Sequence, residues 1–302
     1  MKVLLFGCKG QVGWELQRAL APLGELVALD FDSTGPWRAD FSDPGSLAAT
    51  VQAVRPDVIV NAAAHTAVDR AESEPALART LNAEAPAVLA REAAARGAWL
   101  VHYSTDYVFD GSGDAPRGED APTAPLNVYG ATKLEGEEAI RASGAKHLLF
   151  RTSWVYGTRG GNFARTMLRL AAERDRLAVI DDQIGAPTGA ELLADVTAHA
   201  IRAVVRDAAP GGTYHLVAGG ETSWHGYACR VIEAARAAGA VKVAADAIVA
   251  VPSSEFATAA QRPRNSRLDT TLLRRTFGLE LPPWQVGVDR MLAEILTPTE
   301  PR

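Results

Sequence analysis

A tyrosine and a lysine stand four residues apart in the segment PLNVYGATKLEGEEA, as Tyr129 and Lys133. On a helix these two side chains share one face, so the phenol and the ammonium can reach the same point in space. Such a pair could act on a reacting atom, although a solvated lysine beside a half-buried tyrosine is the commoner explanation when the pattern occurs alone. The neighbouring motifs therefore decide whether the pair has a chemical role.

Two hydroxyl groups and a carboxylate end an apolar segment upstream, as Ser104, Thr105 and Asp106 in WLVHYSTD. Open α/β sheets place ligands at the carboxyl ends of their strands, which would bring these groups to the pair. Reduction of a ketone needs a hydride on carbon and a proton on oxygen. We predict that Tyr129 donates the proton and that the charge of Lys133 lowers the pKa of the phenol. Thr105, rather than Ser104, would hold the carbonyl oxygen.

The first apolar segment of the chain ends in GCKGQVG, with glycine at every third position. Glycines there permit a tight turn, close approach of the backbone to a pyrophosphate and close contact between helix and sheet. The helix that follows would offer free N–H groups to the anion. The next predicted strand ends in Asp30, near the roughly 20-residue spacing of a ribose-binding acid. The pattern predicts a dinucleotide site whose loop residues are Gly7, Lys9, Gly10, Gln11, Val12 and Gly13.

Residues near this loop bear on which nicotinamide cofactor binds. Asp30 would accept hydrogen bonds from ribose hydroxyls, which favours NADH and disfavours a 2′-phosphate. Lys9 and Arg38 could neutralise that phosphate, or each could be a solvated surface cation. We expect both cofactors to bind, with NADPH bound somewhat better.

Apolar segments and alanine-rich helical patterns alternate from KVLLFG to HLLFRTSWVYG. Continuous apolar strands separated by helices indicate a parallel sheet that is buried on both faces. We therefore predict an α/β fold of the doubly wound Rossmann type, with residues 1–155 and about 190–220 in the dinucleotide-binding domain. Loops rich in Pro, Gly and Ser predict a smaller, interleaved substrate-binding lobe at about 156–189 and 221–302. The late segment TYHLVAG is expected to return to the main sheet.

The composition excludes several classes of protein. The chain has 302 residues, 47% of them hydrophobic, which is enough for a large buried core. Its formal net charge of -5 gives no electrostatic support for binding nucleic acid or an anionic membrane surface. No apolar run approaches the roughly 20 residues of a membrane-spanning helix. The two cysteines, Cys8 and Cys229, cannot form a disulfide framework, which fits a reducing cytoplasm.

Six segments stand in order along the chain: NAAAHTAVDRAESE, HYSTDYVFDG, PLNVYGATK, FRTSWVYG, DDQIGAPTGAELLADV and RPRNSRLD. Together they resemble the dTDP-4-dehydrorhamnose reductase family, among the extended short-chain dehydrogenases/reductases, and the resemblance runs essentially from end to end. It implies reduction of dTDP-4-dehydro-β-L-rhamnose to dTDP-β-L-rhamnose by NADPH or NADH, the last step in making this sugar donor. It also implies that Lys133 hydrogen-bonds the nicotinamide ribose.

The resemblance adds residues to the cofactor site. It implies contacts from Asp40 and Phe41, after a third strand-like segment, and from three residues at the end of a fourth strand, Ala63, Ala64 and His65. Taken alone, a histidine at such a position is more often structural.

On the substrate side, the resemblance implies contacts from Thr105, Asp106 and Trp154, although the indole of Trp154 could instead belong to the core. Arg264 and Arg267 in RPRNSRLD would either reach the phosphates of the substrate or tie the two lobes together.

Three glutamates, Glu15, Glu191 and Glu294, match positions where some members of the family bind magnesium across a homodimer interface. Carboxylate oxygens suit hard cations, but separate surface carboxylates are the usual explanation for such residues. A homodimer stabilised by magnesium is therefore a hypothesis at this point.

Other functions remain open beside the reductase. Nucleotide-sugar dehydratases carry Asp-Glu after the threonine, because elimination of water needs an acid and a base, whereas Thr105 is followed here by Asp106 and Tyr107. Reduction is therefore favoured over dehydration. Three alternatives stay open: another nucleotide-sugar reductase, an epimerase, which would retain its cofactor, and a non-catalytic NADP-binding regulatory subunit of another enzyme.

Overall fold

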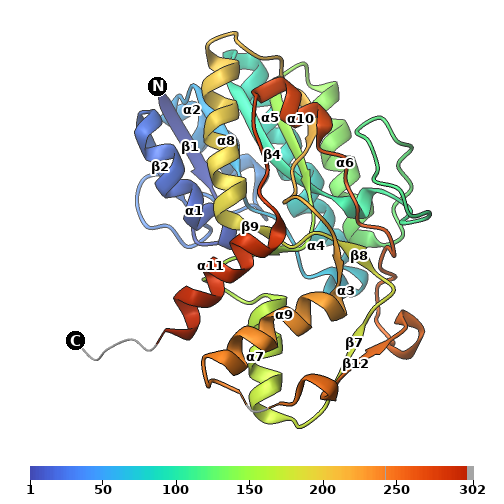
Figure 1. The fold of residues 1–302 in the computed structure, drawn as a ribbon. Coiled ribbons are helices and arrows are strands. Elements are labelled where there is room, and N and C mark those ends of the chain that lie inside the picture. Colours follow the sequence, from blue (N-terminus) through green and yellow to red (C-terminus); the bar gives the residue numbers. More distant parts are fainter. Residues whose placement is uncertain (242, 298–302) are drawn as a thin grey trace.

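The computed structural model describes residues 1–241 and 243–297, which form two lobes of unequal size (Figure 1). The larger lobe contains a six-stranded sheet in the order β10-β5-β4-β3-β1-β2, and every pairing in it is parallel. Its strands are β1 (Lys2–Phe6), β2 (Glu25–Leu29), β3 (Val58–Asn61), β4 (Trp99–Thr105), β5 (Lys146–Thr152) and β10 (Gly212–His215). The strand order reverses direction between β1 and β3, so the predicted doubly wound α/β fold is confirmed.

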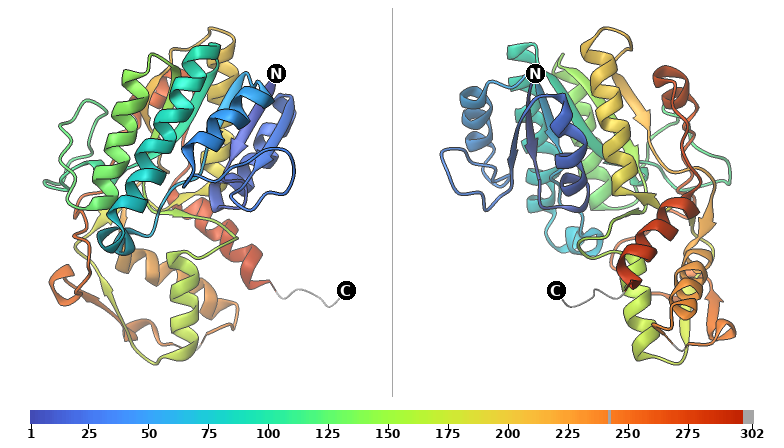
Figure 2. Two further views of the ribbon diagram at one scale, coloured as in Figure 1. Left: turned by 180° about the vertical axis from the view of Figure 1, so that it is seen from behind. Right: turned by 60° about the vertical axis from the view of Figure 1, so that its left-hand side comes forward.

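Helices cover both faces of this sheet (Figure 2). The helices are α1 (Gln11–Leu20) and α8 (Ala190–Val205) on one face, and α2 (Pro44–Val54), α5 (Ala85–Arg96) and α6 (Val128–Ala142) on the other. Alternate side chains of a strand point to opposite faces, and accordingly Leu5 packs in the first cluster and Leu4 in the second. Burial on both faces explains why the strands are continuous apolar segments.

A single π-helical turn, η2 (Thr80–Glu84), lies between the short helices α3 (Val68–Ser73) and α4 (Pro75–Arg79) and helix α5. The fully buried side chain of Asn82 in this turn accepts a hydrogen bond from the N–H of His65 at 2.8 Å and donates one to the His65 carbonyl at 3.1 Å. These two bonds fix the chain that follows β3. Such π turns are frequent at functional sites.

The smaller lobe packs three helices against a two-stranded parallel sheet. Its elements are α7 (Phe163–Glu173), β7 (Leu177–Ile180), α9 (Trp224–Ala237), β12 (Ile248–Val251) and α11 (Trp284–Leu296). Helix α11 runs between this lobe and the larger one (Figure 1). Tyr227 and Val231 of α9 and Val288 of α11 are buried in one cluster, which gives the lobe its own core.

Shorter elements connect the two lobes. Two small sheets pair β6 (Val155–Tyr156) with β9 (Thr188–Gly189) and β8 (Ile184–Gly185) with β11 (Thr222–Ser223). The remaining elements are the 3₁₀ turns η1 (Ala21–Leu23), η3 (Asp106–Val108), η4 (Ala245–Ala247) and η5 (Ser253–Glu255), and helix α10 (Thr271–Phe277).

The structure differs from the sequence analysis at two places. Leu273 of α10 is buried in the core of the main sheet, and Phe277, Leu279 and Leu281 pack against that core, although this segment was assigned to the smaller lobe. The strand-like segment predicted before Asp40 contains no strand, since residues 31–40 hold turns and bends around Gly35, whose φ is +136°. The strand that precedes Ala63 is therefore β3, the third strand and not a fourth.

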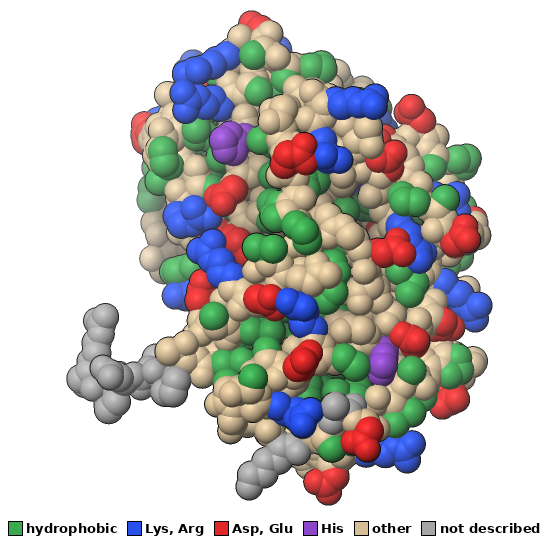
Figure 3. Space-filling model, viewed as in Figure 1, with side chains coloured by type: hydrophobic (Ala, Val, Ile, Leu, Met, Phe, Trp, Pro, Cys, Tyr) green, Lys and Arg blue, Asp and Glu red, His purple; other side chains and the backbone are tan. Residues whose placement is uncertain are grey.

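Acidic and basic side chains are interspersed on the face of the molecule shown in Figure 3, where neither sign forms a continuous patch. Among the described residues, no helix is both long enough and apolar enough to cross a membrane.

Candidate active site

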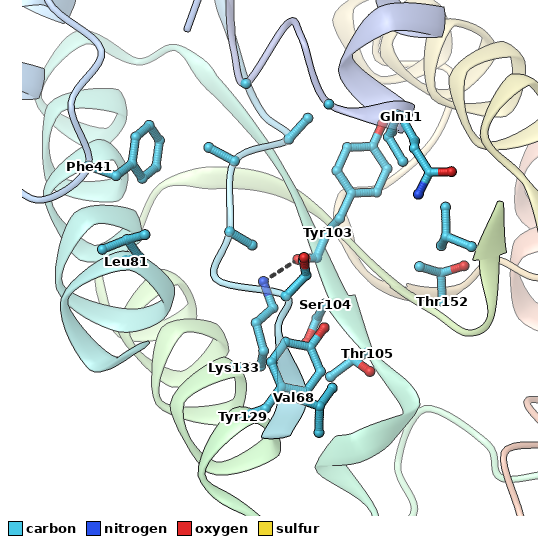
Figure 4. A pocket seen from close by; sticks show the side chains of 18 of the residues that line it. Gln11, Phe41, Val68, Leu81, Tyr103, Ser104, Thr105, Tyr129, Lys133 and Thr152 are labelled. Carbon is cyan, nitrogen blue, oxygen red and sulfur yellow. Dashed lines mark hydrogen bonds between the residues drawn. The ribbon is translucent and has the colours of Figure 1, made fainter. Parts of the chain in front are cut away.

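A cavity of about 780 Å³ opens at the carboxyl ends of β1 to β5. Tyr129 and Lys133 extend into it from α6, toward Ser104 and Thr105 at the end of β4 (Figure 4). Trp224 of α9 contributes to its wall from the smaller lobe. The residues of the predicted site that line this one cavity are Gly7, Gly10, Gln11, Val12, Asp30, Asp40, Phe41, Ala63, Ala64, Thr105, Asp106, Tyr129, Lys133 and Trp154.

The glycine loop owes its shape to close backbone contacts. Gly7 has a φ of +80°, and a Cβ there would lie 2.7 Å from the backbone nitrogen of Ala63. A Cβ on Gly13 would lie 1.9 Å from the carbonyl oxygen of Gly7, so glycine lets α1 begin against the loop. Gly10 caps α1 without a side-chain hydrogen bond, and the first-turn N–H groups from Gln11 onward are available to an anion.

Asp30 is held by the backbone at the end of β2. Its carboxylate accepts hydrogen bonds from the N–H of Lys9 at 2.8 Å and from its neighbour Phe31 at 2.9 Å, and it lines the cavity. The ammonium of Lys9 instead pairs with Asp32 at 2.6 Å, with both side chains exposed. Lys9 therefore contributes its backbone to the loop, and its side chain is engaged outside the lining of the cavity.

The phenol of Tyr129 meets the ring of Tyr107 edge-on, with 5.5 Å between the ring centroids. Burial raises the pKa of Tyr129 to about 12, a hydrogen bond with the Thr105 hydroxyl acts to lower it, and the charge of Asp106 raises it further. The prediction that Lys133 lowers this pKa is wrong for the arrangement seen here. The phenol keeps its proton at neutral pH.

Lys133 is buried, and its ammonium is directed to strand β4. The Nζ atom donates a hydrogen bond to the carbonyl oxygen of Tyr103 at 2.6 Å, drawn in Figure 4, and lies 3.1 Å from Nε2 of His102. Burial lowers the pKa of Lys133 to about 8, against the opposing effect of the Glu137 carboxylate. The lysine can thus change its charge within the range of pH in which enzymes work.

Asp106 begins the turn η3 directly after β4 and is also buried. It accepts a hydrogen bond from the Thr105 hydroxyl at 3.1 Å. Burial raises the pKa of Asp106 to about 6, while hydrogen bonds from Ser266 and Thr105 act to lower it. Burial therefore destabilises the charged form of Asp106, and this carboxylate lies beside Thr105 and Tyr129.

Trp154 follows β5 and has a left-handed backbone with φ of 50°, which is uncommon for a bulky residue. Its indole stacks on Trp224 with 3.7 Å between ring centroids, and Phe163 lies against the same Trp224 at 4.6 Å. A Cβ on Gly185 would approach the Trp154 ring to 2.8 Å. The indole thus lines the cavity as part of an aromatic stack that includes the smaller lobe.

Comparison with known proteins identifies the family. The family model described as RmlD substrate binding domain matches residues 1–297. A dTDP-4-dehydrorhamnose reductase of Shigella flexneri is 61% identical over 299 residues, which cover 99% of each chain. The chain belongs to the dTDP-4-dehydrorhamnose reductase family.

Solved structures of the family agree in fold. A dTDP-4-dehydrorhamnose reductase of Clostridium acetobutylicum superposes with a TM-score of 0.88 at 33% identity, covering 98% of this chain and 99% of that one. A dTDP-4-dehydrorhamnose reductase of Bacillus anthracis, in complex with NADP, gives 0.85 at 34% identity, covering 97% and 99%.

Other residues that the family resemblance suggested do not meet the cavity. His65 is buried behind it, with its backbone held by Asn82 and its Nε2 3.8 Å from a carboxylate oxygen of Glu74. Gly13 supports the loop from the side of α1. Arg267 pairs with Glu221 at 2.6 Å, which ties two loops together.

The sequence analysis assigned no site role to several residues that line the cavity: Phe31, Ser42, Thr66, Val68, Leu77, Leu81, Tyr103, Tyr107, Thr152, Ser153 and Trp224. Thr152 and Ser153 could have been found, because they end β5 just as Ser104 and Thr105 end β4. Trp224 begins a helix of the smaller lobe and carries no local motif.

The three glutamates of the predicted magnesium site do not form a metal site within one chain. Among the described residues, no group of three or more His, Cys, Asp or Glu side chains is arranged to hold a metal ion. The carboxylates do affect one another: burial raises the pKa of Glu191, and the charges of Glu15 and Glu294 raise it further, against Arg290.

Proposed function

We propose that this protein reduces the C4 ketone of dTDP-4-dehydro-β-L-rhamnose with NADPH or NADH, giving dTDP-β-L-rhamnose, the last step of dTDP-L-rhamnose biosynthesis. The observation that carries the proposal is that Thr105, Tyr129 and Lys133 line one cavity, which the glycine loop also borders. The 61% identity to the dTDP-4-dehydrorhamnose reductase of Shigella flexneri supports the substrate.

The residues of the cavity fit a nicotinamide dinucleotide. Gly7 and the start of α1 offer close backbone approach and free N–H groups to a pyrophosphate, and Asp30 offers a carboxylate to a ribose. Asp40, Phe41, Ala63 and Ala64 form the adjoining wall. When bound, the reduced cofactor supplies the hydride. The related structure from Bacillus anthracis that contains NADP supports this assignment.

The proton comes from Tyr129. Because burial keeps its pKa near 12, the phenol holds a proton at neutral pH and can donate it to the oxygen of the ketone. Thr105 positions that oxygen through its hydroxyl. Lys133, one helical turn away, is assigned to the ribose of the cofactor, to which its charged form would donate a hydrogen bond.

A second cavity of about 850 Å³ suits the nucleotide part of the substrate. Arg174, Arg262 and Arg264 line it together with Phe256 and Trp224, and Trp224 also lines the first cavity. Guanidinium groups complement a diphosphate, and aromatic rings offer stacking surfaces to a base. We therefore assign Arg264 to the phosphates, because its side chain is exposed and only loosely paired with Asp182 at 3.7 Å, whereas Arg267 is largely buried and is paired with Glu221 at 2.6 Å.

The deciding experiment incubates purified protein with NADPH and freshly prepared dTDP-4-dehydro-L-rhamnose and follows cofactor oxidation and product by NMR. We expect a single C4 epimer, dTDP-β-L-rhamnose, because a cofactor and a sugar held in fixed positions let hydride reach only one face of C4, while Tyr129 protonates the oxygen. The free sugar without the nucleotide should react poorly, since remote binding energy orients the ketone. Formation of the 6-deoxy-L-talose epimer as main product would contradict the substrate assignment and leave the reductase assignment standing.

Two alternatives give different results in simple assays. An epimerase would be purified with stoichiometric bound NAD and would turn over without consuming added cofactor. A regulatory subunit would bind NADP but would show no turnover in isolation. Tyr129 and Lys133 would serve an epimerase as well, whereas a regulatory subunit would not need the complete set of Thr105, Tyr129 and Lys133 that the cavity brings together.

Preference for NADPH over NADH depends on Lys9 in this proposal. Its ammonium pairs with Asp32 at the rim, 2.6 Å away, and could turn to a 2′-phosphate. Fluorescence titration should show tighter binding of NADPH, and undetectable NADPH binding would refute the preference. In Asp32→Asn the lysine loses its charged partner, so the affinity ratio should move further toward NADPH.

We also propose that the protein is a homodimer in which both copies supply carboxylates that bind magnesium. Its proposed location is the cytoplasm. The support is that the negative charges of Glu15 and Glu294 act on the partly buried carboxylate of Glu191, and a cation would offset them. Light scattering should show a dimer that magnesium stabilises, and a monomer under both conditions would end the proposal. The two free cysteines, Cys8 and Cys229, agree with a reducing compartment.

A further inference from the structure

A buried histidine with no assigned role lies directly behind Lys133. His102 is 1% exposed on β4, and its two ring nitrogens face two different side chains. Nδ1 lies 3.0 Å from Nδ2 of Asn61, its neighbour across the sheet at the end of β3, and Nε2 lies 3.1 Å from Nζ of Lys133. Burial and the charge of Lys133 hold the pKa of His102 well below its ordinary value, so the imidazole is neutral.

The direction of these hydrogen bonds is set by the backbone. The N–H of Ala63 is a donor that cannot be reversed, and it lies 3.0 Å from Oδ1 of Asn61. The amide of Asn61 must therefore direct its NH₂ group at Nδ1 of His102, which then accepts. A neutral imidazole carries one proton, which must reside on Nε2. An N–H consequently faces Nζ of Lys133.

We propose that Asn61 and His102 are positioning residues that present this N–H to Lys133 and thereby oppose its ammonium form, which increases the fraction of uncharged amine in the cofactor-free enzyme. An amine has a lone pair that accepts from Nε2–H and still donates to the carbonyl of Tyr103. An ammonium has no acceptor and would place two donors against each other. The opposite tautomer of His102 would place its Nδ1–H against the Asn61 amide instead.

Other groups around Lys133 act in the opposite sense or are already paired. Glu137, one turn along α6, favours the ammonium, but its carboxylate is bound by Arg151 of β5 at 2.7 Å and by Arg141 of α6 at 2.9 Å. Tyr129 at the start of α6 is neutral. Asp106 beyond β4 acts on Tyr129. The hydrogen-bonded pair of Asn61 and His102, which we call the relay, is thus the polar contact that opposes the charge of Lys133. Burial acts in the same direction.

The functional consequence rests on the proposed function. Ribose hydroxyls of a bound cofactor would offer acceptors to Nζ and favour the ammonium, so cofactor binding should take up protons near pH 8. The relay would then couple the charge of Lys133, and with it the hydrogen bond to the ribose, to the presence of cofactor.

NMR tests the relay without any activity measurement. The chain has six histidines and five lysines, so ¹⁵N-labelled imidazole and ¹³Cε-labelled lysine spectra are simple to assign by substitution. We expect His102 to carry its proton on Nε2 and Lys133 to titrate at about 8. A proton on Nδ1 of His102, or an ordinary lysine titration for Lys133, would overturn the relay.

Two substitutions reverse the direction of the relay. In Asn61→Asp the carboxylate accepts from both Ala63 and His102, so the proton moves to Nδ1 and Nε2 becomes an acceptor for the ammonium. His102→Gln offers an amide oxygen to Lys133 without adding charge, which separates hydrogen-bond direction from Coulomb attraction. Both should raise the pKa of Lys133 by about one pH unit or more. Val101→Ala, on the same strand but the opposite face, should destabilise the fold and leave that pKa unchanged.

Calorimetry in buffers of different ionisation enthalpy tests the coupling. NADPH binding near pH 8 should take up protons in the wild type and fewer in His102→Gln. Equal uptake in the wild type and in both relay variants would overturn the relay. A correct tautomer without any proton uptake on binding would instead contradict the proposed contact of Lys133 with the cofactor, so the two failures are distinguishable.

Discussion

The main sheet and the smaller lobe contribute different kinds of residues to the two walls of the cleft, by which we mean the two adjoining cavities. On the side of the main sheet, which we call the sheet wall, Lys133 and Thr105 are buried. The glycine loop is fixed there by the close approach of the backbones of Gly7 and Gly13. The wall that faces the smaller lobe, which we call the lobe wall, consists of the stacked rings of Trp154 and Trp224 and of arginines such as Arg264. The side chain of Arg264 is 70% exposed. One wall is rigid and polar, and the other is aromatic and solvated.

This difference assigns different tasks to the two walls. Proton and hydride transfer require atoms to be placed within fractions of an ångström, which buried side chains on regular elements can provide. Recognition of a nucleotide tolerates adjustment, and rings with long cationic side chains provide it. Substitutions in the sheet wall should therefore change chemistry or cofactor binding, and substitutions in the lobe wall should change substrate affinity.

The largest effect is expected from Tyr129→Phe in the sheet wall. Loss of the proton donor should lower kcat by about 10²- to 10⁴-fold, the usual contribution of general acid catalysis. Cofactor affinity, measured by fluorescence titration, should be retained because the ring remains. Tyr214→Phe, which removes a hydroxyl bonded to the carbonyl of Pro210 at the sheet edge, is the matched control with normal turnover. Near-normal kcat for Tyr129→Phe would remove the residue from its role.

Asp106 lies where the two walls meet. Because its carboxylate is buried, we expect it to lower the stability of the folded protein at neutral pH. Its pKa rises from 3.8 in the unfolded chain to about 6 in the fold, so the native state holds the extra proton between these pH values. Folding stability attributable to this group is therefore lost as pH rises through that window. The difference of 6 − 3.8 = 2.2 pH units corresponds to about 3 kcal/mol.

Replacement of that carboxylate measures the cost. By urea unfolding, Asp106→Asn should exceed the wild type in free energy of unfolding by up to about 3 kcal/mol at pH 7 and should equal it near pH 4. Turnover should fall. Asp110→Asn is the control of opposite sign, because hydrogen bonds from Ser112 lower the pKa of Asp110. A gain for Asp106→Asn that does not depend on pH would contradict the argument.

The sequence predicted the sheet wall better than the lobe wall, for a physical reason. Gly7, Gly13 and Asp30 lie in or near one continuous motif whose spacing expresses a local requirement of the backbone. Tyr129 and Lys133 share a helix, so their common face follows from helical periodicity alone. Such residues can be identified without any knowledge of tertiary packing.

Contacts between distant segments could not be predicted in this way. Nothing in the segment around Trp224 indicates that its ring meets Trp154, because the two belong to different lobes. The pairing of Lys9 with Asp32 and the direction of Lys133 toward His102 also depend on how separate elements meet. The expected effect of Lys133 on Tyr129 failed because a shared helix face does not fix where a long side chain ends.

The glycine loop allows a sharper test of the rigid wall by comparing Gly13→Ala with Gly10→Ala. A Cβ at Gly13 would meet the Gly7 carbonyl at 1.9 Å, whereas one at Gly10 would lie 3.4 Å away. Gly13→Ala should therefore destabilise the protein by about 1–3 kcal/mol and lower its melting temperature. Gly10→Ala should melt normally but bind NADPH more weakly, since its methyl group enters the cavity. Equal melting temperatures for the two variants would contradict the proposed geometry.

The smallest effect is expected in the lobe wall, from Trp224→Ala. Stacked aromatic pairs contribute about 0.5–1.5 kcal/mol beyond their buried area, so the KM for the dTDP-sugar should rise about 2- to 10-fold. Because Trp224 belongs to the smaller lobe, whereas the glycine loop lies at the end of the main sheet, NADPH affinity should fall less than affinity for the dTDP-sugar. Trp224→Phe keeps an aromatic face and should recover most of the loss. If Trp224→Ala weakened NADPH as much as the sugar nucleotide, the aromatic stack would be supporting the whole cleft, and the division of tasks between the two walls would be wrong.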